Sequence, residues 1–404
     1  MLSRGTFGTR AGASRTKPVI LLGVTVDQSL KLLRGQPQFL ASNGWEVHVV
    51  SAGDSTHPPE YYLGPASDVV IHKLVMSRRP SVARDITSAL AWIRLLHHIR
   101  PDVVCLGTPK AGLVGLAAAW LLRIPSRIYL LRGLRLEGQQ GLSRRALRAF
   151  EKLTAAMATH IIAVSDSVSV AAQSEGIGRR KSLQVLGKGS SNGIDIPTQQ
   201  QLRLLRDQRD AVLLSVGLDP TQPVVGFVGR LTPDKGVHLL ADACISLRAM
   251  GVPVQLLLVG AEDSPNCQTQ LRRALEIGDV PHAMTGYVER PTEFMAAMDV
   301  FCLPSLREGM PNVSLEAAAL GLPVVTSDAT GCRDSVLNNV TGLTFNYERS
   351  ESLVCGLQTL LEDQGMRTRF GNAGAKWVSE NFDRQTVWNL YEDFYRDAYL
   401  ASCR

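Results

Sequence analysis

The chain lacks the residue patterns of several protein classes. Its seven cysteines are scattered, odd in number and without a C-x-x-C pair, which argues against a disulfide framework and for a reducing cytoplasm. Its eight histidines form no H-E-x-x-H or similar spacing, so we expect no zinc site. No apolar run approaches the roughly 18 residues that span a bilayer. Residues 1–16 are basic and lack the apolar segment of a secretory signal, so we expect a disordered tail on a cytoplasmic protein.

Cofactor and nucleic-acid motifs are missing as well. No G-x-G-x-x-G follows the first apolar run and no Walker A sequence occurs, which disfavours a Rossmann oxidoreductase and a P-loop enzyme. Zinc-finger spacing, an aromatic RNP-type strand and a basic zipper are all absent, which disfavours a nucleic-acid partner. No acidic cluster suggests a divalent metal. We therefore expect neither a resident cofactor nor a metal.

The charge of the chain is unevenly distributed. At 404 residues the chain is long enough for two domains with separate cores. Residues 1–195 hold 25 Lys and Arg against 12 Asp and Glu, a net charge of +13, whereas the remainder holds 18 against 25, a net charge of −7. The basic half indicates contact with an anionic substrate or surface.

Both halves alternate apolar, β-branched runs with amphipathic stretches. In the first half we predict strands at residues 19–25, 46–51, 69–74, 103–106, 127–131 and 161–165, and helices at 30–42, 83–99, 111–122 and 143–157. Strands restart at 223–229, 254–260, 300–303 and 323–326. Continuous apolar strands separated by helices are typical of parallel sheets covered on both faces.

This pattern predicts an α/β protein with two Rossmann-like domains, at residues 17–195 and 196–385. The stretch 193–209 has no strand pattern and is interpreted as the connection. An aromatic-rich helix is predicted at 386–400, within a terminal segment that ends at residue 404. Ligands of such sheets bind beyond the carboxyl ends of the strands, so the cleft between the domains is the expected site.

Two glutamates, Glu308 and Glu316, flank the start of a predicted helix at residues 313–320. Asn312 is the predicted N-cap, and the free N–H groups at such a helix end favour phosphates. Carboxylates are good partners for sugar hydroxyls. The segment therefore indicates a nucleotide-sugar site, although two glutamates can also be solvated surface charges.

Two cations follow the strand at residues 223–229. Arg230 and Lys235 straddle a turn of Pro, Asp and Gly residues just before a helix. An Arg fork and a Lys point charge both suit phosphate oxygens, and fixed cations stabilise a departing diphosphate. An ordinary surface turn is the alternative for this segment alone.

These segments resemble the E-x7-E and G-R-x-x-x-x-K-G sequences of the retaining glycosyltransferases of family 4. The resemblance implies a GT-B fold, in which two Rossmann-like domains with parallel sheets face an interdomain cleft, and a donor bound without metal. It implies that Glu308 contacts the donor sugar, that Arg230 and Lys235 meet the diphosphate, and that Glu316 contacts the ribose. The other implied donor-site residues are Gly229, Gly309, Met310, Asn312 and Val288. Val288 would border the base, unless its loop is an ordinary strand-end turn.

Segments of the first half resemble a subgroup that builds capsule, exopolysaccharide and O-antigen chains. They are Thr-Pro-Lys-Ala-Gly at 108–112 and Arg-Gly-Leu-Arg-Leu-Glu at 132–137. The resemblance makes Lys110, Arg132 and Arg135 candidate acceptor-binding residues, and three cations would suit a polyprenyl diphosphate-linked sugar. Many members of the family have His in place of Arg132, and cations on solvated loops are the alternative for all three.

The predicted helix 143–157 is both basic and apolar. Its cations Arg144, Arg145, Arg148 and Lys152 alternate with Leu147, Phe150 and Leu153. Such a helix can lie on the anionic inner face of a membrane or present a solvated face to water.

The sequence thus predicts a retaining transferase that moves a hexose or N-acetylhexosamine from a nucleotide sugar, with UDP preferred. The expected acceptor is a glycan in surface polysaccharide biosynthesis, lipid-linked through polyprenyl diphosphate or soluble. Two alternatives remain: a sugar-nucleotide epimerase on the same fold, and a non-catalytic partner that binds nucleotide or glycan.

Overall fold

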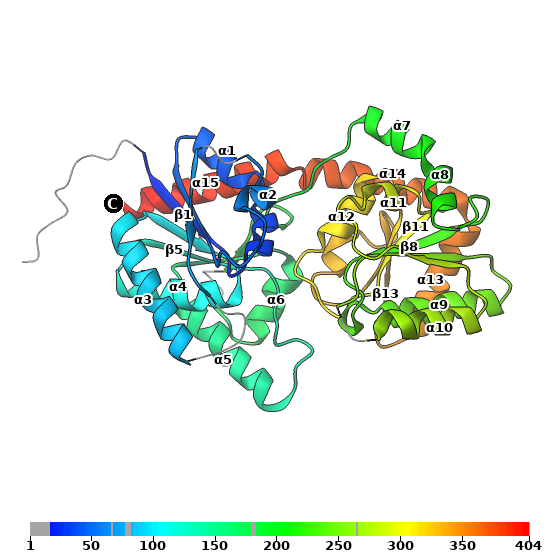
Figure 1. The fold of residues 1–404 in the computed structure, drawn as a ribbon, viewed down its shortest axis with the longest axis horizontal. Helices are drawn as coiled ribbons and strands as arrows, with labels where there is room; N and C mark the ends of the chain where they lie inside the picture. The colour runs from blue at the N-terminus through cyan, green and yellow to red at the C-terminus, as the bar shows by residue number, and fades with distance from the viewer. Residues whose placement is uncertain (1–16, 66–67, 77–81, 179–182, 264–265, 404) are drawn as a thin grey trace, which may run out of the picture.

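A computed structural model describes residues 17–65, 68–76, 82–178, 183–263 and 266–403. The predicted tail at 1–16 lies outside these residues. The chain forms two lobes, each with a parallel sheet between layers of helices (Figure 1). The two Rossmann-like domains expected from the alternating pattern are therefore confirmed.

The first sheet has seven strands in the order β3-β2-β1-β4-β5-β6-β7. They are β1 (Val19–Gly23), β2 (Glu46–Ser51), β3 (Val69–Lys73), β4 (Val103–Leu106), β5 (Ser126–Leu131), β6 (His160–Ala163) and β7 (Leu183–Val185). All pair in parallel, with Val19 opposite Glu46 and Ile20 opposite Val103. The helical elements are η1 (Asp27–Leu33), α1 (Gln36–Ser42), α2 (Pro59–Leu63), α3 (Val82–Ile99), α4 (Pro109–Leu121), α5 (Gly141–Met157) and α6 (Asp166–Ser174).

Successive residues of β1 point to opposite faces of this sheet. Val19 and Leu21 join a core with Trp92, whereas Ile20 and Leu22 join a second core with Trp45 and Tyr391. Because both faces of the sheet are buried, the strands are continuous apolar runs in the sequence. These runs made it possible to predict the strands.

The second sheet has six strands in the order β10-β9-β8-β11-β12-β13. They are β8 (Val224–Val228), β9 (Gln255–Val259), β10 (His282–Met284), β11 (Val300–Leu303), β12 (Val324–Ser327) and β13 (Gly342–Phe345). The helical elements are α7 (Gln199–Asp207), α8 (Arg209–Ser215), η2 (Pro233–Lys235), α9 (Val237–Ala249), α10 (Cys267–Ile277), α11 (Thr292–Ala296), α12 (Asn312–Ala319), η3 (Arg333–Ser335), α13 (Ser350–Glu362) and α14 (Gln364–Asn381). The strand order reverses at β1/β4 and at β8/β11, where sheets of this kind bind ligands.

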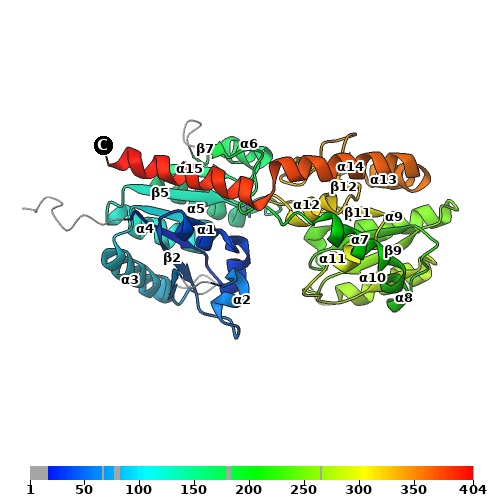
Figure 2. The same cartoon turned by 90° about the horizontal axis from the view of Figure 1, so that it is seen from above.

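The last helix, α15 (Arg384–Ser402), belongs to the first lobe in space. Figure 2 shows it running from the second lobe back along the first. Tyr391 and Tyr395 are buried in the core of the first domain. The Ser126 hydroxyl also donates to the carbonyl of Ala398 at 2.7 Å. The chain therefore crosses between the domains a second time.

Two sequence expectations need correction. The helix predicted at 30–42 is broken into η1 and α1 at Gly35, where φ is +82° and a Cβ would lie 2.5 Å from the Trp388 ring. The connection at 193–209 contains helix α7, which begins with a capping box between Thr198 and Gln201. The short strands β7, β10 and β13 were not anticipated either.

No helix in the described part of the chain is long and apolar enough to cross a membrane.

Candidate active site

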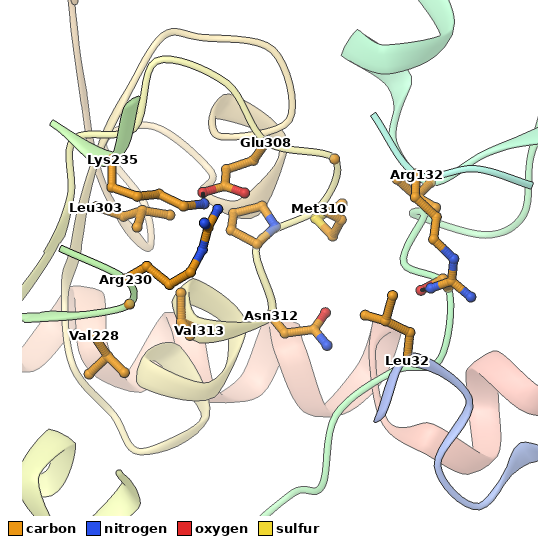
Figure 3. Close-up of a pocket in the computed structure, with 15 residues that line it drawn as sticks. Leu32, Arg132, Val228, Arg230, Lys235, Leu303, Glu308, Met310, Asn312 and Val313 are labelled. Carbon is orange, nitrogen blue, oxygen red and sulfur yellow. Dashed lines mark hydrogen bonds and ion pairs between the residues drawn. The ribbon is translucent and has the colours of Figure 1, made fainter. Parts of the chain in front are cut away.

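A cavity of about 390 Å³ lies between the two domains. It is bounded by residues that follow β5, β8 and β11 and by the start of α12. Its lining consists of Leu32, Arg132, Val164, Ser191, Val228, Gly229, Arg230, Lys235, Leu303, Glu308, Gly309, Met310, Pro311, Asn312 and Val313. Figure 3 shows Arg230, Lys235 and Glu308 gathered on one side of this cavity and Arg132 on the other.

Lys235 and Glu308 form an ion pair inside the cavity. The Lys235 ammonium lies 2.5 Å from Oε1 of Glu308, and the two side chains are only 18% and 16% exposed. Lys235 ends the turn η2, and the Glu308 amide donates to the carbonyl of Thr330 at 2.8 Å. The pair therefore holds a carboxylate and a cation side by side, both open to a ligand.

Arg230 has a looser partner. Its Nη1 lies 2.5 Å from Oδ2 of Asp263, but both side chains are more than half exposed. Exposed ion pairs contribute little, about 0–1 kcal/mol. A ligand anion can therefore displace Asp263 at low cost.

Helix α12 begins one residue earlier than expected. Its N-cap is Pro311, with φ −76° and ψ 102°, and no side chain caps it. Asn312 is thus the first helical residue, and its prediction as the N-cap is wrong. The amides of Ser314 and Leu315 donate to the Pro311 carbonyl, whereas those of Asn312 and Val313 precede the first helical acceptor. Both of these residues line the cavity, so the positive end of the helix faces it.

Arg132 forms part of the opposite wall. Its Nη1 lies 2.5 Å from the Ser191 hydroxyl, and its buried Nε has no hydrogen-bond partner. Burial lowers the pKa of this guanidinium, and no carboxylate of the described residues pairs with it. The charge of Arg132 is therefore left for a ligand to compensate.

The two walls approach each other at Gly309. A Cβ on this residue would lie 2.1 Å from the carbonyl oxygen of Arg132. The Ser165 hydroxyl, from the first domain, donates to the Gly309 carbonyl at 2.9 Å. Glycine at this position lets the loop that carries Glu308 meet the first domain.

Four of the predicted site residues lie outside this cavity. Glu316 and Val288 do not line it. Glu316 is half-buried one turn further along α12, where burial raises the pKa of its carboxyl and the Arg384 guanidinium opposes that shift. Lys110 and Arg135 line a separate cavity in the first domain. The three cations assigned to the acceptor thus lie in two cavities rather than one.

Some residues of the site were missed in the sequence. Ser191 lies on a glycine-rich loop whose spacing could have indicated a site, whereas Leu32 and Val164 carry no signal of their own. The described residues contain no group of three or more His, Cys, Asp or Glu side chains that could hold a metal.

Two family models match the chain, one on each domain. Residues 38–186 match the glycosyl transferase 4-like domain, and residues 210–377 match the glycosyl transferases group 1 model. The capsular polysaccharide biosynthesis glycosyltransferase CapM of Staphylococcus aureus is 34% identical over 372 residues, which cover 92% of this chain and 95% of CapM.

Two other proteins show similarity at greater distance. The N,N'-diacetylbacillosaminyl-diphospho-undecaprenol alpha-1,3-N-acetylgalactosaminyltransferase of Campylobacter jejuni is 26% identical over 308 residues, 74% of this chain and 79% of that protein. The crystal structure of Anabaena Alr3699/HepE with UDP and glucose has a TM-score of 0.74 at 22% identity and covers 94% of this chain and 100% of its own. That structure supports the GT-B fold. The match to CapM extends over nearly the full length of both chains, and the two family models together cover both domains. This protein therefore belongs to family 4 of the glycosyltransferases and is itself a glycosyltransferase.

Proposed function

We propose that the protein transfers a hexose or N-acetylhexosamine, with retention of configuration, from a UDP-sugar to a polyprenyl-diphosphate-linked glycan. One observation carries this proposal. Two cations, a carboxylate and the start of a helix converge in a single interdomain cavity. This is the combination that a sugar with a diphosphate leaving group requires.

The diphosphate of the donor would bind between η2 and α12. Lys235 and Arg230 supply charge from one side, and the amides of Asn312 and Val313 supply donors from the other. Charge-assisted hydrogen bonds of this kind are about twice as strong as neutral ones. The same groups stabilise the negative charge that develops as the diphosphate leaves.

The nucleoside would extend beyond the cavity along α12. In this arrangement Glu316 binds the ribose hydroxyls and Val288 borders the base. The bound UDP in the Anabaena structure, which has the same fold, supports UDP as the nucleotide. Gly229, Gly309 and Met310 line the cavity, and in this arrangement they would lie between the phosphates and the sugar.

Glu308 is the one carboxylate among the described residues that line the cavity. Because Lys235 neutralises it at 2.5 Å, we assign it to a sugar hydroxyl rather than to attack on the anomeric carbon. The acceptor hydroxyl then attacks from the side of the leaving group. The bond from the anomeric carbon to the diphosphate breaks, the bond to the acceptor oxygen forms on the same face, and the diphosphate accepts the hydroxyl proton. The transition state has oxocarbenium character.

The acceptor would enter from the first domain, whose residues form the wall around Arg132. The role in surface polysaccharide synthesis is supported by the similarity to CapM, and the lipid-linked acceptor by the undecaprenol-linked substrate in the Campylobacter enzyme's name. Such an acceptor would place the reaction at the cytoplasmic face of a membrane.

The test is the anomeric configuration of the product. The protein is incubated with UDP-, GDP-, ADP- and dTDP-sugars and short prenyl diphosphate sugars, and the new linkage is read by proton NMR. A UDP-sugar that yields a product with the configuration of the donor supports the proposal. An inverted product contradicts retention, conversion of the donor without acceptor indicates an epimerase, and binding without turnover indicates a non-catalytic partner.

A further inference from the structure

A loop at residues 187–193 connects the cation Arg132 of the cavity wall to the last helix of the chain. Ser191, in this loop, lines the cavity between the domains and accepts a hydrogen bond from Nη1 of Arg132 at 2.5 Å. Figure 3 shows Arg132 on the side of the cavity that the first domain forms. The direction of its guanidinium therefore depends on where the loop places the Ser191 hydroxyl.

The residue before Ser191 is fixed through its backbone. Ser190 is 1% exposed and has a φ of +72°, a left-handed conformation that is uncommon for residues other than glycine. Its amide donates to the carbonyl of Val164 at 2.7 Å, and its carbonyl accepts from the Tyr391 hydroxyl of α15 at 3.0 Å. Its hydroxyl accepts from the amide of Gly193 at 3.0 Å. A conformation of this kind persists where its surroundings determine it, and α15 supplies part of these surroundings.

The residue after Ser191 is fixed through its side chain. Asn192 is 3% exposed, and its Oδ1 accepts from the indole Nε1 of Trp388 at 2.7 Å. Its Nδ2 donates to the carbonyl of Arg34 at 2.9 Å. Because one end of the amide accepts and the other donates, the two partners together determine its orientation. Asn192 thus ties the loop both to α15 and to the segment between η1 and α1.

Trp388 is itself held firmly in the first domain. Its ring packs on Phe39, with the ring centroids 5.4 Å apart, and on Gly35, where a Cβ would lie 2.5 Å from the ring. Trp388 and Tyr391 are three residues apart and therefore lie on one face of α15. Both residues that flank Ser191 are consequently bonded to the same face of this helix.

We propose that Trp388 is a positioning residue, which holds the guanidinium of Arg132 in the cavity through Asn192 and Ser191. Trp388 does not itself line the cavity. Without its indole N–H, the buried Oδ1 of Asn192 lacks a donor, and the loop is free to move to satisfy it. Ser191 then moves with its neighbour, and Arg132 loses its hydroxyl partner. The inference rests on the proposed function for its consequence, since Arg132 forms the wall at which the acceptor would enter.

The first measurement follows Arg132 itself by NMR, in protein labelled with nitrogen-15 in its arginine side chains. The buried Nε of Arg132 has no hydrogen-bond partner among the described residues, so its N–H resonance depends on the position of the side chain. The signal that is missing from Arg132→Met identifies this resonance. We expect Trp388→Phe, which keeps an aromatic ring but removes the N–H, to shift or broaden it.

Two further variants make this measurement specific. Asn192→Ala removes the acceptor of the same hydrogen bond and leaves Trp388 in place, so it should also shift or broaden the Arg132 resonance. The control is Trp45→Phe, which removes another indole N–H that joins the first domain to α15, where it donates to Glu392 at 3.3 Å. This variant should leave the Arg132 resonance unchanged. Thermal melting verifies that each variant folds.

The second measurement is a double-mutant cycle on sugar transfer, with Trp388→Phe, Arg132→Met and the two combined. Because Trp388 acts through Arg132, Trp388→Phe should reduce transfer by about threefold to tenfold when Arg132 is present and should change nothing in the Arg132→Met variant. A merely structural role of Trp388 would reduce transfer by the same factor in both backgrounds. Trp45→Phe should leave transfer as it is in the wild type.

Two results would overturn the inference. One is an Arg132 resonance that changes in neither Trp388→Phe nor Asn192→Ala, and the other is a loss of transfer from Trp388→Phe that is equal with and without Arg132. Transfer that requires Arg132 but not Trp388 also counts against the inference and leaves the proposed function standing. An Arg132 resonance that responds to Trp388→Phe in a protein without transferase activity supports the positioning and contradicts the proposed function alone.

Discussion

The cavity between the domains is lined by three cations, Arg132, Arg230 and Lys235, against a single described carboxylate, Glu308. Lys235 and Arg230 have acidic partners at 2.5 Å, whereas Arg132 donates to the hydroxyl of Ser191 and has no acidic partner in the described part of the chain. A buried charge without a charged partner is costly, so the fold alone does not explain the presence of Arg132. A role in binding an anionic or hydroxyl-rich ligand explains it.

Replacing Arg132 tests this assignment. We expect Arg132→Met to leave the melting temperature unchanged or higher, because an uncompensated charge is removed, and to reduce transfer by roughly tenfold or more. Thermal melting and turnover are measured on the same preparation. The control is Arg127→Met, whose guanidinium donates to the carbonyls of Met157 and Ile124 and whose loss should lower the melting temperature. A destabilised Arg132→Met protein with normal turnover would show a structural role instead.

If Glu316 binds the ribose, as proposed, nucleotide binding should depend on pH. Burial raises the pKa of its carboxyl, so in the free protein it takes up a proton at a higher pH than an exposed glutamate does. Ribose hydroxyls donate to the ionised form, and UDP affinity should therefore fall as the pH falls through this raised pKa. The loss should be about tenfold, the value of a hydrogen bond to a charged group.

Calorimetry at pH 7.5 and pH 5.5 measures this dependence. The Gln side chain of Glu316→Gln does not titrate, so the pH dependence that remains in this variant comes from the titration of UDP itself. The affinity of the variant for UDP should therefore change less between the two pH values than that of the wild type. Equal changes in both proteins would remove Glu316 from the nucleotide site.

The sequence indicated some of these residues and not others. Arg230, Lys235 and Glu308 follow buried strands directly, and the carboxyl ends of parallel strands meet at one edge, so their convergence could be predicted. Lys110, Arg132 and Arg135 also follow strands, yet they occupy two cavities. The direction of a side chain on a loop depends on packing such as that of Arg132 on Gly107, which no local pattern encodes.

Among the elements, α12 and α15 decide how the site is built. The start of α12 was predicted within one residue, but Pro311 rather than Asn312 precedes it. The first two residues of the helix still line the cavity, so the anion site at this helix start stays a prediction. The break at Gly35 was not predicted. The φ of +82° and the close approach of the Trp388 ring favour glycine there, and Trp388 is far away in the sequence.

Helix α15 is expected to stabilise the first domain through its tyrosines. Tyr395 is fully buried, and its hydroxyl lies 3.4 Å from the Cys105 sulfur. Tyr395→Ala should lower the free energy of unfolding by about 3–5 kcal/mol, as for other large aromatic truncations. Tyr395→Phe keeps the ring and should lose far less. Urea unfolding measures both variants, and equal losses would attribute the effect to the hydroxyl rather than to packing.

In the whole molecule, contacts between the domains surround the cavity. Asp334 of the second domain accepts hydrogen bonds from the amide and hydroxyl of Ser167, and the Thr330 hydroxyl donates to Glu137 of the first domain at 2.7 Å. Together with Gly309 and α15, these contacts hold both walls of the site in place. The two-domain architecture was predictable from repeated apolar strands, whereas these contacts join residues too distant in sequence to be paired in advance.

The most direct test of the account is the affinity of UDP for the wild type, Lys235→Ala and Lys376→Ala, measured by calorimetry. Lys376 is an exposed lysine of α14, 77% accessible and paired only with Glu380, so its loss makes the same charge change away from the cavity. The account predicts that UDP binds the wild type and Lys376→Ala alike and binds Lys235→Ala about tenfold or more weakly. Equal affinities for all three proteins, or no binding of UDP to any, would contradict a donor diphosphate site between the domains.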